Sequence, residues 1–277
     1  VVLITKNDEV IYTNQDCDEN KSANLTDRSL LNVRDILDFA ESVDLKEVEE
    51  LLQRQIDYNM AIAEEGMKGD WGANIGSVLL DTWGDDVKVR AKALAAAGSD
   101  ARMSGCDLPV VIASGSGNQG ITASVPVIEY AKELGSDKET LLRALIVSNL
   151  VTIHQKTGIG RLSAYCGAVS AGCGAGAGIA WLHGGRFEEV AHTIVNALAT
   201  VSGIICDGAK PSCAAKIASS VDAGILGFHM FERGQQFYGG DGIVTKGVEN
   251  TIKNIGRLGR EGMRETDKEI IRIMLGD

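Results

Sequence analysis

Four cysteines fall within a short span of the sequence and form two pairs with the same spacing. Cys166 and Cys173 lie in "CGAVSAGCGAGAG", and Cys206 and Cys213 lie in "CDGAKPSC", so six residues separate the members of each pair. Free cysteine is among the most buried residue types, and packing alone can account for any one of them. The neighbours of the first pair are almost all Gly and Ala, which allow a close approach of backbone or ligand.

Cysteines that converge from the ends of helices are potential metal ligands, and we expect these four to lie at such ends. Zinc sites usually have about two to four residues between paired cysteines, which these pairs do not match. An iron–sulfur cluster is larger than a single ion and accepts varied spacings. Three cysteine ligands would leave one iron open as a Lewis acid for a substrate oxygen or sulfur. On this hypothesis the Gly/Ala run makes space for a cluster.

A second stretch, "ASGSGNQGITAS" at residues 113–124, is a Ser/Gly-rich loop that leads into a helix. Such loops collect backbone N–H groups and hydroxyls around an anion at the helix N-terminus. Ser114, Ser116 and Gly117 supply these groups, and the amides of Asn118 and Gln119 can bind a carboxylate and an amino group. The alternative is a tight glycine turn without a ligand. The loop does not end in the Gly-Lys-Ser/Thr of a nucleotide-binding P-loop.

The segment "SGSGNQG" is also similar to the phosphate-binding loop of pyridoxal-phosphate dehydratases. Lys88 and Lys92 precede it and would be the candidates for a Schiff base. Those enzymes alternate strands and helices around the loop, and this sequence has no such alternation. We therefore expect no pyridoxal phosphate.

The stretch "IHQKTGIGRLSAYCG" places Lys156 and Ser163 shortly before Cys166. A cation near a helix C-terminus is favoured by the helix dipole, so Lys156 has a structural explanation as well as a functional one. Ser163 is close enough in sequence to share a pocket with Cys166.

Composition limits the classes of partner. The formal net charge is −11 and no run of Lys or Arg is present, so nucleic acid and anionic membranes are excluded as partners. No stretch is apolar for the length of a bilayer, and no signal peptide opens the chain. Six cysteines without secretory features indicate a reducing compartment, the cytoplasm. Apolar, Gly-rich helices also favour a homodimer.

The elements that must position these residues are mainly helices. "VVLITKNDEVIYTN" alternates apolar and polar residues around a turn and predicts a β-hairpin, the end of a truncated α+β domain over residues 1–20. Residues 21–277 show three- and four-residue apolar spacing and predict a helical domain with central buried helices. One helix is expected to end at Gly98, and another to begin with a capping box from Ser136 to Glu139.

Taken together, these stretches resemble a known family. The sequence is similar to the L-cysteine desulfidases, whose uncharacterised bacterial members are related to the iron–sulfur L-serine dehydratase alpha chain. The similarity covers most of residues 1–277 and is carried by "SGCDLPVVIASGSGNQGITASVPVIEYAKELG", "HQKTGIGRLSAYCGAVSAGCGAGAG" and "GIICDGAKPSCAAKI".

The resemblance implies a lyase that carries a [4Fe–4S] cluster, sensitive to air, on Cys166, Cys206 and Cys213. It leaves Cys173 as a packing thiol. It assigns "SGSGNQG" to the substrate pocket, and gives Lys156 and Ser163 catalytic positions. Family members also carry a Gly-Cys-Thr-Glu-Pro-like motif with the catalytic base, which this chain lacks; Cys17 does not match it. We therefore expect the base to lie in a missing N-terminal segment, and this chain alone to be inactive without it.

The implied reaction converts L-cysteine to pyruvate, sulfide and ammonia. L-serine is the alternative substrate, because the leaving group is set by pocket shape. A domain that binds an amino acid or small anion without catalysis is the alternative from another functional class.

Overall fold

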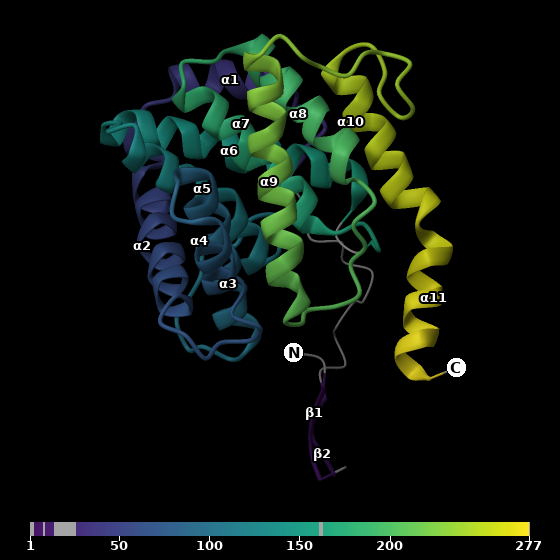
Figure 1. Cartoon of the computed structure of the whole chain (residues 1–277). Coiled ribbons are helices and arrows are strands. Elements are labelled where there is room, and N and C mark those ends of the chain that lie inside the picture. Colours follow the sequence, from purple (N-terminus) through teal and green to yellow (C-terminus); the bar gives the residue numbers. More distant parts are fainter. Residues whose placement is uncertain (1–2, 8, 14–25, 161–162, 277) are drawn as a thin grey trace. The chain divides into compact units, whose positions relative to one another are not determined.

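The computed structural model of the chain describes residues 3–7, 9–13, 26–160 and 163–276. The chain divides into two compact units, Val1–Leu30 and Leu31–Asp277. The first unit contains the strands and the second contains the helices (Figure 1). The prediction of a mainly α fold with an N-terminal hairpin is confirmed.

The hairpin consists of β1 (Leu3–Lys6) and β2 (Glu9–Thr13), which pair antiparallel. Asn7 has a positive φ of 51° in the turn between them, a conformation that Asn tolerates better than most residues. Both strands are exposed along their whole length, so the hairpin has no buried face within its own unit.

The second unit is built from helices joined by loops, the longest of which connect α4 to α5 and α9 to α10. Their bounds are α1 (Val33–Ser42), η1 (Leu45–Glu47), α2 (Glu49–Gly66), α3 (Ile75–Trp83), α4 (Val87–Met103), α5 (Gly117–Glu133), α6 (Lys138–Ile159), α7 (Gly167–Leu182), α8 (Phe187–Val201), α9 (Ser212–Glu232), α10 (Val248–Arg257), η2 (Leu258–Gly262) and α11 (Arg264–Leu275).

Two helix ends differ from the sequence predictions. Helix α4 does not stop at Gly98 but continues to Met103, because Gly98 lies against the backbone of Ala63 and serves helix packing instead of termination. Helix α6 is capped by Asp137, whose side chain accepts from the N–H of Thr140, so the predicted capping box from Ser136 is wrong by one residue.

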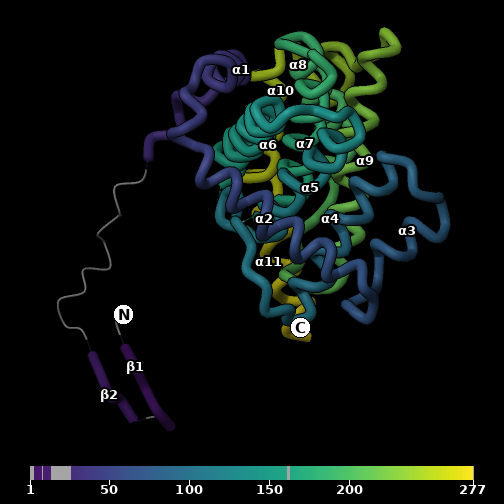
Figure 2. The backbone as a smooth tube through the Cα atoms, turned by 90° about the vertical axis from the view of Figure 1, so that its left-hand side faces the viewer, coloured from purple at the N-terminus to yellow at the C-terminus, as the bar shows by residue number. Residues whose placement is uncertain are grey.

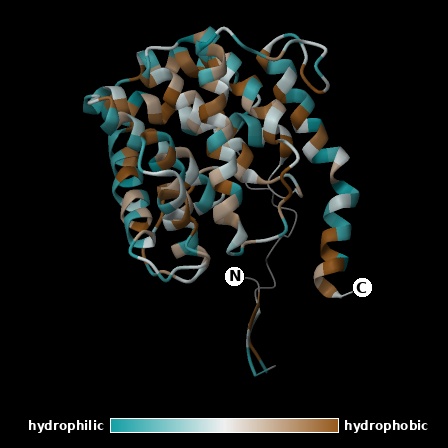
Figure 3. Ribbon diagram, in the orientation of Figure 1, coloured by the Kyte–Doolittle hydropathy of each residue, from teal (hydrophilic) through white to brown (hydrophobic). Residues whose placement is uncertain are grey.

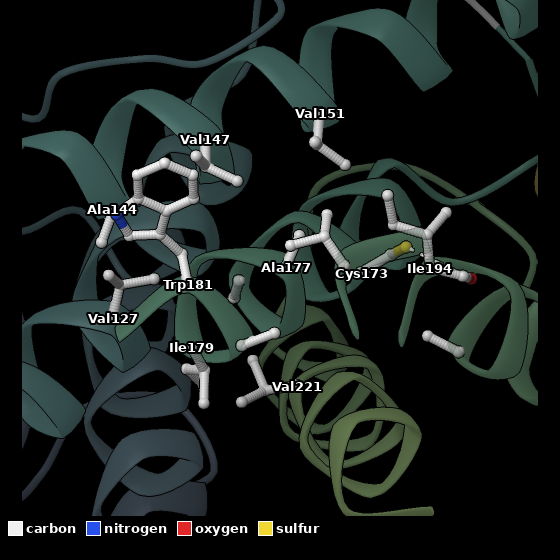
Figure 4. Close-up of a cluster of buried hydrophobic side chains, with 14 of the residues drawn as sticks. Val127, Ala144, Val147, Val151, Cys173, Ala177, Ile179, Trp181, Ile194 and Val221 are labelled. Atoms are coloured by element: carbon white, nitrogen blue, oxygen red, sulfur yellow. Dashed lines mark hydrogen bonds between the residues drawn. The ribbon is translucent and has the colours of Figure 1, made fainter. Parts of the chain in front are cut away.

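Helix α7 lies at the centre of the unit. It packs against α5, α6, α8 and α9, and every residue from 168 to 181 is buried (Figure 2). The Gly/Ala run of the sequence is therefore a helix, and Cys173 is in its interior instead of at the end of an element. Figure 4 shows Cys173 among apolar side chains, where its thiol lies 3.7 Å from the carbonyl oxygen of Ile194.

Small residues bring α7 very close to its neighbours. A Cβ added at Gly172 would lie 2.4 Å from the Ser220 carbonyl group of α9. On the other side, a Cβ at Gly174 would lie 2.2 Å from Thr152 Oγ1 of α6. The hypothesis that this run makes space for a cluster is therefore wrong for most of its length, because neighbouring helices already fill that space.

Helix α11 is the least covered part of the helical unit. No residue of this helix is buried. Four of its apolar side chains are 53–73% exposed: Ile271, Ile273, Met274 and Leu275. The apolar residues near its C-terminal end are visible in Figure 3. The core that positions the cavity described below is formed by the helices before it.

Candidate functional site

The sequence-predicted residues come together around one cavity of about 280 Å³. Its walls come from the end of α4, the start of α5, the end of α6, the start of α7 and the segment leading into α9. All the predicted site residues except Gly117 line it: Ser114, Ser116, Asn118, Gln119, Lys156, Ser163, Cys166, Cys206 and Cys213. Hollows of about 550 and 750 Å³ elsewhere on the surface contain none of them.

The Ser/Gly-rich loop is a tight turn held in place by a buried amide. Ser114 and Gly115 both have positive φ, 49° and 88°, and backbone hydrogen bonds join Ala113 and Ser116 in both directions. Two successive residues with positive φ are the mark of a type I′ turn. Before the turn, the fully buried Asn59 of α2 donates to the carbonyl of Val111 and accepts from its N–H. The loop is thus fixed to the helices on one side and faces the cavity on the other.

Sequence reasoning missed Arg102, which also lines the cavity. It lies in the last turn of α4, and its Nη1 donates to Asn118 Oδ1 at 3.2 Å. A Cβ at Gly117 would lie 2.4 Å from Arg102 Nε, so the guanidinium packs directly on the start of α5. The signal in the sequence was weak, since Arg102 lies outside the loop motif and at a helix end where a cation is common.

Gln119 joins the start of α5 to the start of α7. Its side chain is 8% exposed, and its amide carbon would lie 2.5 Å from a Cβ at Gly167. Its Oε1 is buried and has no hydrogen-bond partner in the described part of the chain. Glycine at position 167 is therefore needed for the amide to reach this position beside Cys166.

The cavity-lining cysteines come from three different places in the fold. Cys166 is the N-cap of α7, Cys206 lies in the extended segment after α8, and Cys213 is in the first turn of α9. Backbone hydrogen bonds from Cys166 N to Ile204 O and from Cys206 N to Ala164 O clamp the first two segments together. Packing of α7 against α9 brings Cys213 to the same cavity.

The thiols of Cys166 and Cys206 interact through a hydrogen bond. The hydrogen bond between their sulfurs, together with burial, raises the pKa of the Cys166 thiol. The same hydrogen bond lowers the pKa of Cys206, whose burial opposes its ionisation while the N–H of Gly208 and the cation of Lys216 favour it. Of the two thiols, Cys206 is therefore the one whose surroundings favour the thiolate.

A small ion-pair network lies behind Cys206. Asp207 forms ion pairs with Lys210, at 2.7 Å, and with Lys216. These partners lower the pKa of Asp207 to about 2. The network fixes the segment that carries Cys206 and places the Lys216 cation near the thiols of Cys166 and Cys213.

Lys156 and Ser163 occupy different environments within the cavity wall. Lys156 is 5% exposed, and burial lowers the pKa of its amine although the thiols of Cys206 and Cys166 favour its charge. Ser163 is engaged in the protein itself. Its Oγ donates to the carbonyl of Gly259 at 2.6 Å and accepts from the N–H of Tyr165 at 3.0 Å.

Other candidates from the sequence lie elsewhere. Lys88 pairs with Asp86 and Lys92 pairs with Asp222, and neither lysine lines the cavity. Cys17 falls outside the described residues.

The donor set suits an iron–sulfur cluster better than a single ion. Within the described residues, no three His, Cys, Asp or Glu side chains lie close enough to hold one metal ion. Cys166, Cys206 and Cys213 nevertheless line one cavity, and a polynuclear cluster is larger than a single ion. Soft thiolates are the ligands such clusters use. The residues present therefore fit a cluster held by three cysteines.

Comparison with known proteins gave a consistent set of matches. A family model described as the serine dehydratase alpha chain matches residues 6–272. A UPF0597 protein of Desulfitobacterium hafniense is 68% identical over 275 residues, covering 99% of this chain and 64% of the relative. A UPF0597 protein of Lachnoclostridium phytofermentans is 58% identical, covering 94% of this chain and 62% of the relative. One of Treponema denticola is 51% identical, covering 100% of this chain and 65% of the relative.

The chain thus spans slightly less than two thirds of the length of these relatives. No solved structure matches it. In the described residues, no helix is both long enough and apolar enough to cross a membrane.

Proposed function

This chain belongs to the serine dehydratase alpha chain family, and from that premise we propose that it is a lyase that deaminates a β-substituted L-amino acid with a [4Fe–4S] cluster on Cys166, Cys206 and Cys213. The preferred substrate is L-cysteine, which would give pyruvate, sulfide and ammonia. L-serine is the alternative, and the family description favours it. Cysteines that serve as cluster ligands must stay free of disulfides, which suits a reducing compartment, so we propose a cytoplasmic location.

One observation carries this proposal: three thiols and two cations, but no carboxylate, are among the described residues that line the same cavity. Arg102 and Lys156 are the cations, and none of the described residues lining the cavity is Asp or Glu. The whole chain has a net charge of −11, so two lining cations without a described lining carboxylate contrast with the overall acidity of the chain. It suits an anionic substrate beside a thiolate-bound cluster.

When bound, a cluster with one open iron supplies a Lewis acid for a substrate oxygen or sulfur. The protein's own groups bind and orient the substrate. The turn at Ser114–Ser116 and the first N–H groups of α5 face the polar end of the amino acid. Fixing that end restricts the orientation of the Cα–H bond and of the β-substituent.

Lys156 Nζ is buried in the wall near Cys166 and Cys206, where it can donate a hydrogen bond to a carboxylate or to the departing β-group. A base takes the α-proton, and the β-group leaves as sulfide or hydroxide. The aminoacrylate then tautomerises to an imine, and water hydrolyses it to pyruvate and ammonia. We propose that the base comes from a part of the protein outside the described residues, because the relatives are longer than this chain.

The test is iron and acid-labile sulfide per chain, measured on full-length protein purified and reconstituted without oxygen. We expect about four of each and a broad visible absorption. Cys166→Ala, Cys206→Ala and Cys213→Ala should each lose most of the iron while keeping the helical circular dichroism. Cys106→Ala is the matched control, because this half-buried thiol does not line the cavity.

Two results would refute the proposal. One is a wild-type protein without iron after anaerobic reconstitution, and the other is unchanged iron content in the three ligand variants. Amino-acid binding by an iron-free wild type would instead support a binding domain without catalysis. With iron present, the rates of pyruvate formation from L-cysteine and L-serine decide between the two substrates.

A further inference from the structure

The guanidinium of Arg102 is a cation with no anionic partner among the residues that the structure describes. Among the described residues it forms no ion pair, and its hydrogen bond to Asn118 Oδ1 uses only one of its N–H groups. The side chain belongs to the cavity wall and packs on Gly117. The remaining N–H donors therefore have no carboxylate to bind within the described protein.

The surroundings of Arg102 favour an anion in the cavity. Its guanidinium contacts the first residue of α5, where the helix dipole places partial positive charge. Lys156 adds a second cation to the same cavity. The C-terminus of α4 offsets part of the Arg102 charge. A carboxylate in the cavity would satisfy both the guanidinium and the N-terminus of α5.

Gln119 gives an independent indication of a ligand. The side chain is 8% exposed and lines the cavity, yet its amide oxygen has no partner in the described part of the chain. A buried amide oxygen without a hydrogen bond is destabilising. An ammonium group in the cavity would supply the missing donor.

We propose that Arg102 binds the α-carboxylate and Gln119 the α-ammonium of a free L-amino acid, so that these two residues make the site specific for substrates that carry both groups. The proposal rests on the proposed function, which it deepens by naming the residues that select the substrate class. Between them the two side chains hold the ends of the amino acid along α5. Gln119 contacts Gly167, the residue after Cys166. The side chain of the bound amino acid, with its β-substituent, therefore faces the part of the cavity that the cysteines line.

The experiment is calorimetric titration of full-length, cluster-loaded protein with three probes. L-serine carries both groups, ethanolamine lacks the carboxylate, and 3-hydroxypropanoate lacks the ammonium. We expect the wild type to bind L-serine about 10- to 100-fold more tightly than either analogue, the range expected for losing a hydrogen-bonded charge.

Variants then assign each preference to a residue. Arg102→Gln should weaken L-serine binding about 10- to 100-fold and remove the preference over ethanolamine. Arg102→Lys keeps the charge but not the planar guanidinium group, so its affinity for L-serine should lie between those of the wild type and Arg102→Gln. Gln119→Leu should remove the preference over 3-hydroxypropanoate. Arg54→Gln, on the exposed surface of α2, is the control and should bind all three probes as the wild type does.

Iron and sulfide content separates this proposal from the proposed function. Arg102→Gln with normal iron and wild-type affinity for L-serine would overturn the role of Arg102 and leave the lyase intact. Equal affinity of the wild type for L-serine and ethanolamine would overturn it as well. A wild type that holds no iron refutes the proposed lyase function. Its affinity for L-serine relative to ethanolamine and 3-hydroxypropanoate still decides whether Arg102 and Gln119 select amino acids.

Discussion

Gly172 and Gly224 are in direct backbone contact where α7 packs against α9. A Cβ added at Gly224 would lie 2.3 Å from the carbonyl oxygen of Gly172, a separation that no real side chain adopts. Each residue therefore has to be glycine for the two helices to approach this closely. The contact matters for the site, because α7 follows Cys166 and α9 carries Cys213.

Gly224→Ala is expected to push α9 away from α7. We expect a loss of about 2 kcal/mol in the free energy of unfolding, because overpacked cores can relax only by backbone shifts. Retention of iron by the reconstituted protein should also fall, since the separation of Cys166 and Cys213 changes. Chemical denaturation and iron analysis measure the two effects.

The matched control for this substitution is Gly203→Ala. A Cβ at Gly203 would have nothing within 4 Å, and its φ is not positive. The control should therefore unfold within about 0.5 kcal/mol of the wild type. Equal stability of Gly224→Ala and Gly203→Ala would show that the contact between the helices is not tight.

Gly167→Ala tests whether glycine is needed for the position of Gln119. The new methyl group would lie 2.4 Å from Gln119 Nε2, so the amide must move out of its place beside α7. We expect L-serine binding to weaken about tenfold or more, with helix content unchanged. Titration calorimetry measures the affinity. Wild-type affinity in this variant would mean that the amide position is not needed for binding.

The sequence motifs bring together residues that line one cavity, but they do not reveal every element that contributes to it. The loop motif and three of the four paired cysteines, Cys166, Cys206 and Cys213, lie around one cavity, because these residues stand at or shortly before the start of a helix, where backbone N–H groups are free. Arg102 was missed because it comes from a helix end outside any motif. Only the packing of α4 on α5 brings it to the cavity.

The role of the Gly/Ala run could not be predicted from local pattern. Glycine lowers helix propensity, so "GAVSAGCGAGAG" does not indicate a helix by itself. Burial on every side overrides that preference: Gly172 and Gly176 meet α9, while Gly174 and Gly178 meet α6. Tertiary contacts, which no periodicity reveals, determine that residues 167–182 form the central helix.

Ser163→Ala separates a catalytic from a structural role for this hydroxyl. Ser163 Oγ joins the loop before α7 to η2 through Gly259 and supports the N–H of Tyr165. We expect the variant to lose about 1–2 kcal/mol of stability, because two hydrogen bonds in a partly buried place are broken. If the hydroxyl also acts on the substrate, kcat should fall at unchanged iron content. Loss of stability with wild-type kcat would restrict Ser163 to positioning the loop.

Acid should weaken the contact that Glu249 makes with α6 and α1. Its carboxylate binds His154 Nε2 at 2.8 Å and accepts from the N–H of Val33 at 2.7 Å. Burial opposes ionisation, but these hydrogen bonds outweigh it and lower the pKa of Glu249 below its ordinary value of 4.5. The carboxylate therefore stabilises the fold above that value, and the contribution is lost as the pH falls through the lower pKa of the folded state.

Glu249→Gln should be less stable than the wild type by about 1 kcal/mol at about pH 5.5, and nearly as stable as the wild type at about pH 3, as measured by urea denaturation. The exposed Glu64→Gln serves as control, and a stability gap for Glu249→Gln that does not narrow on acidification would contradict this role.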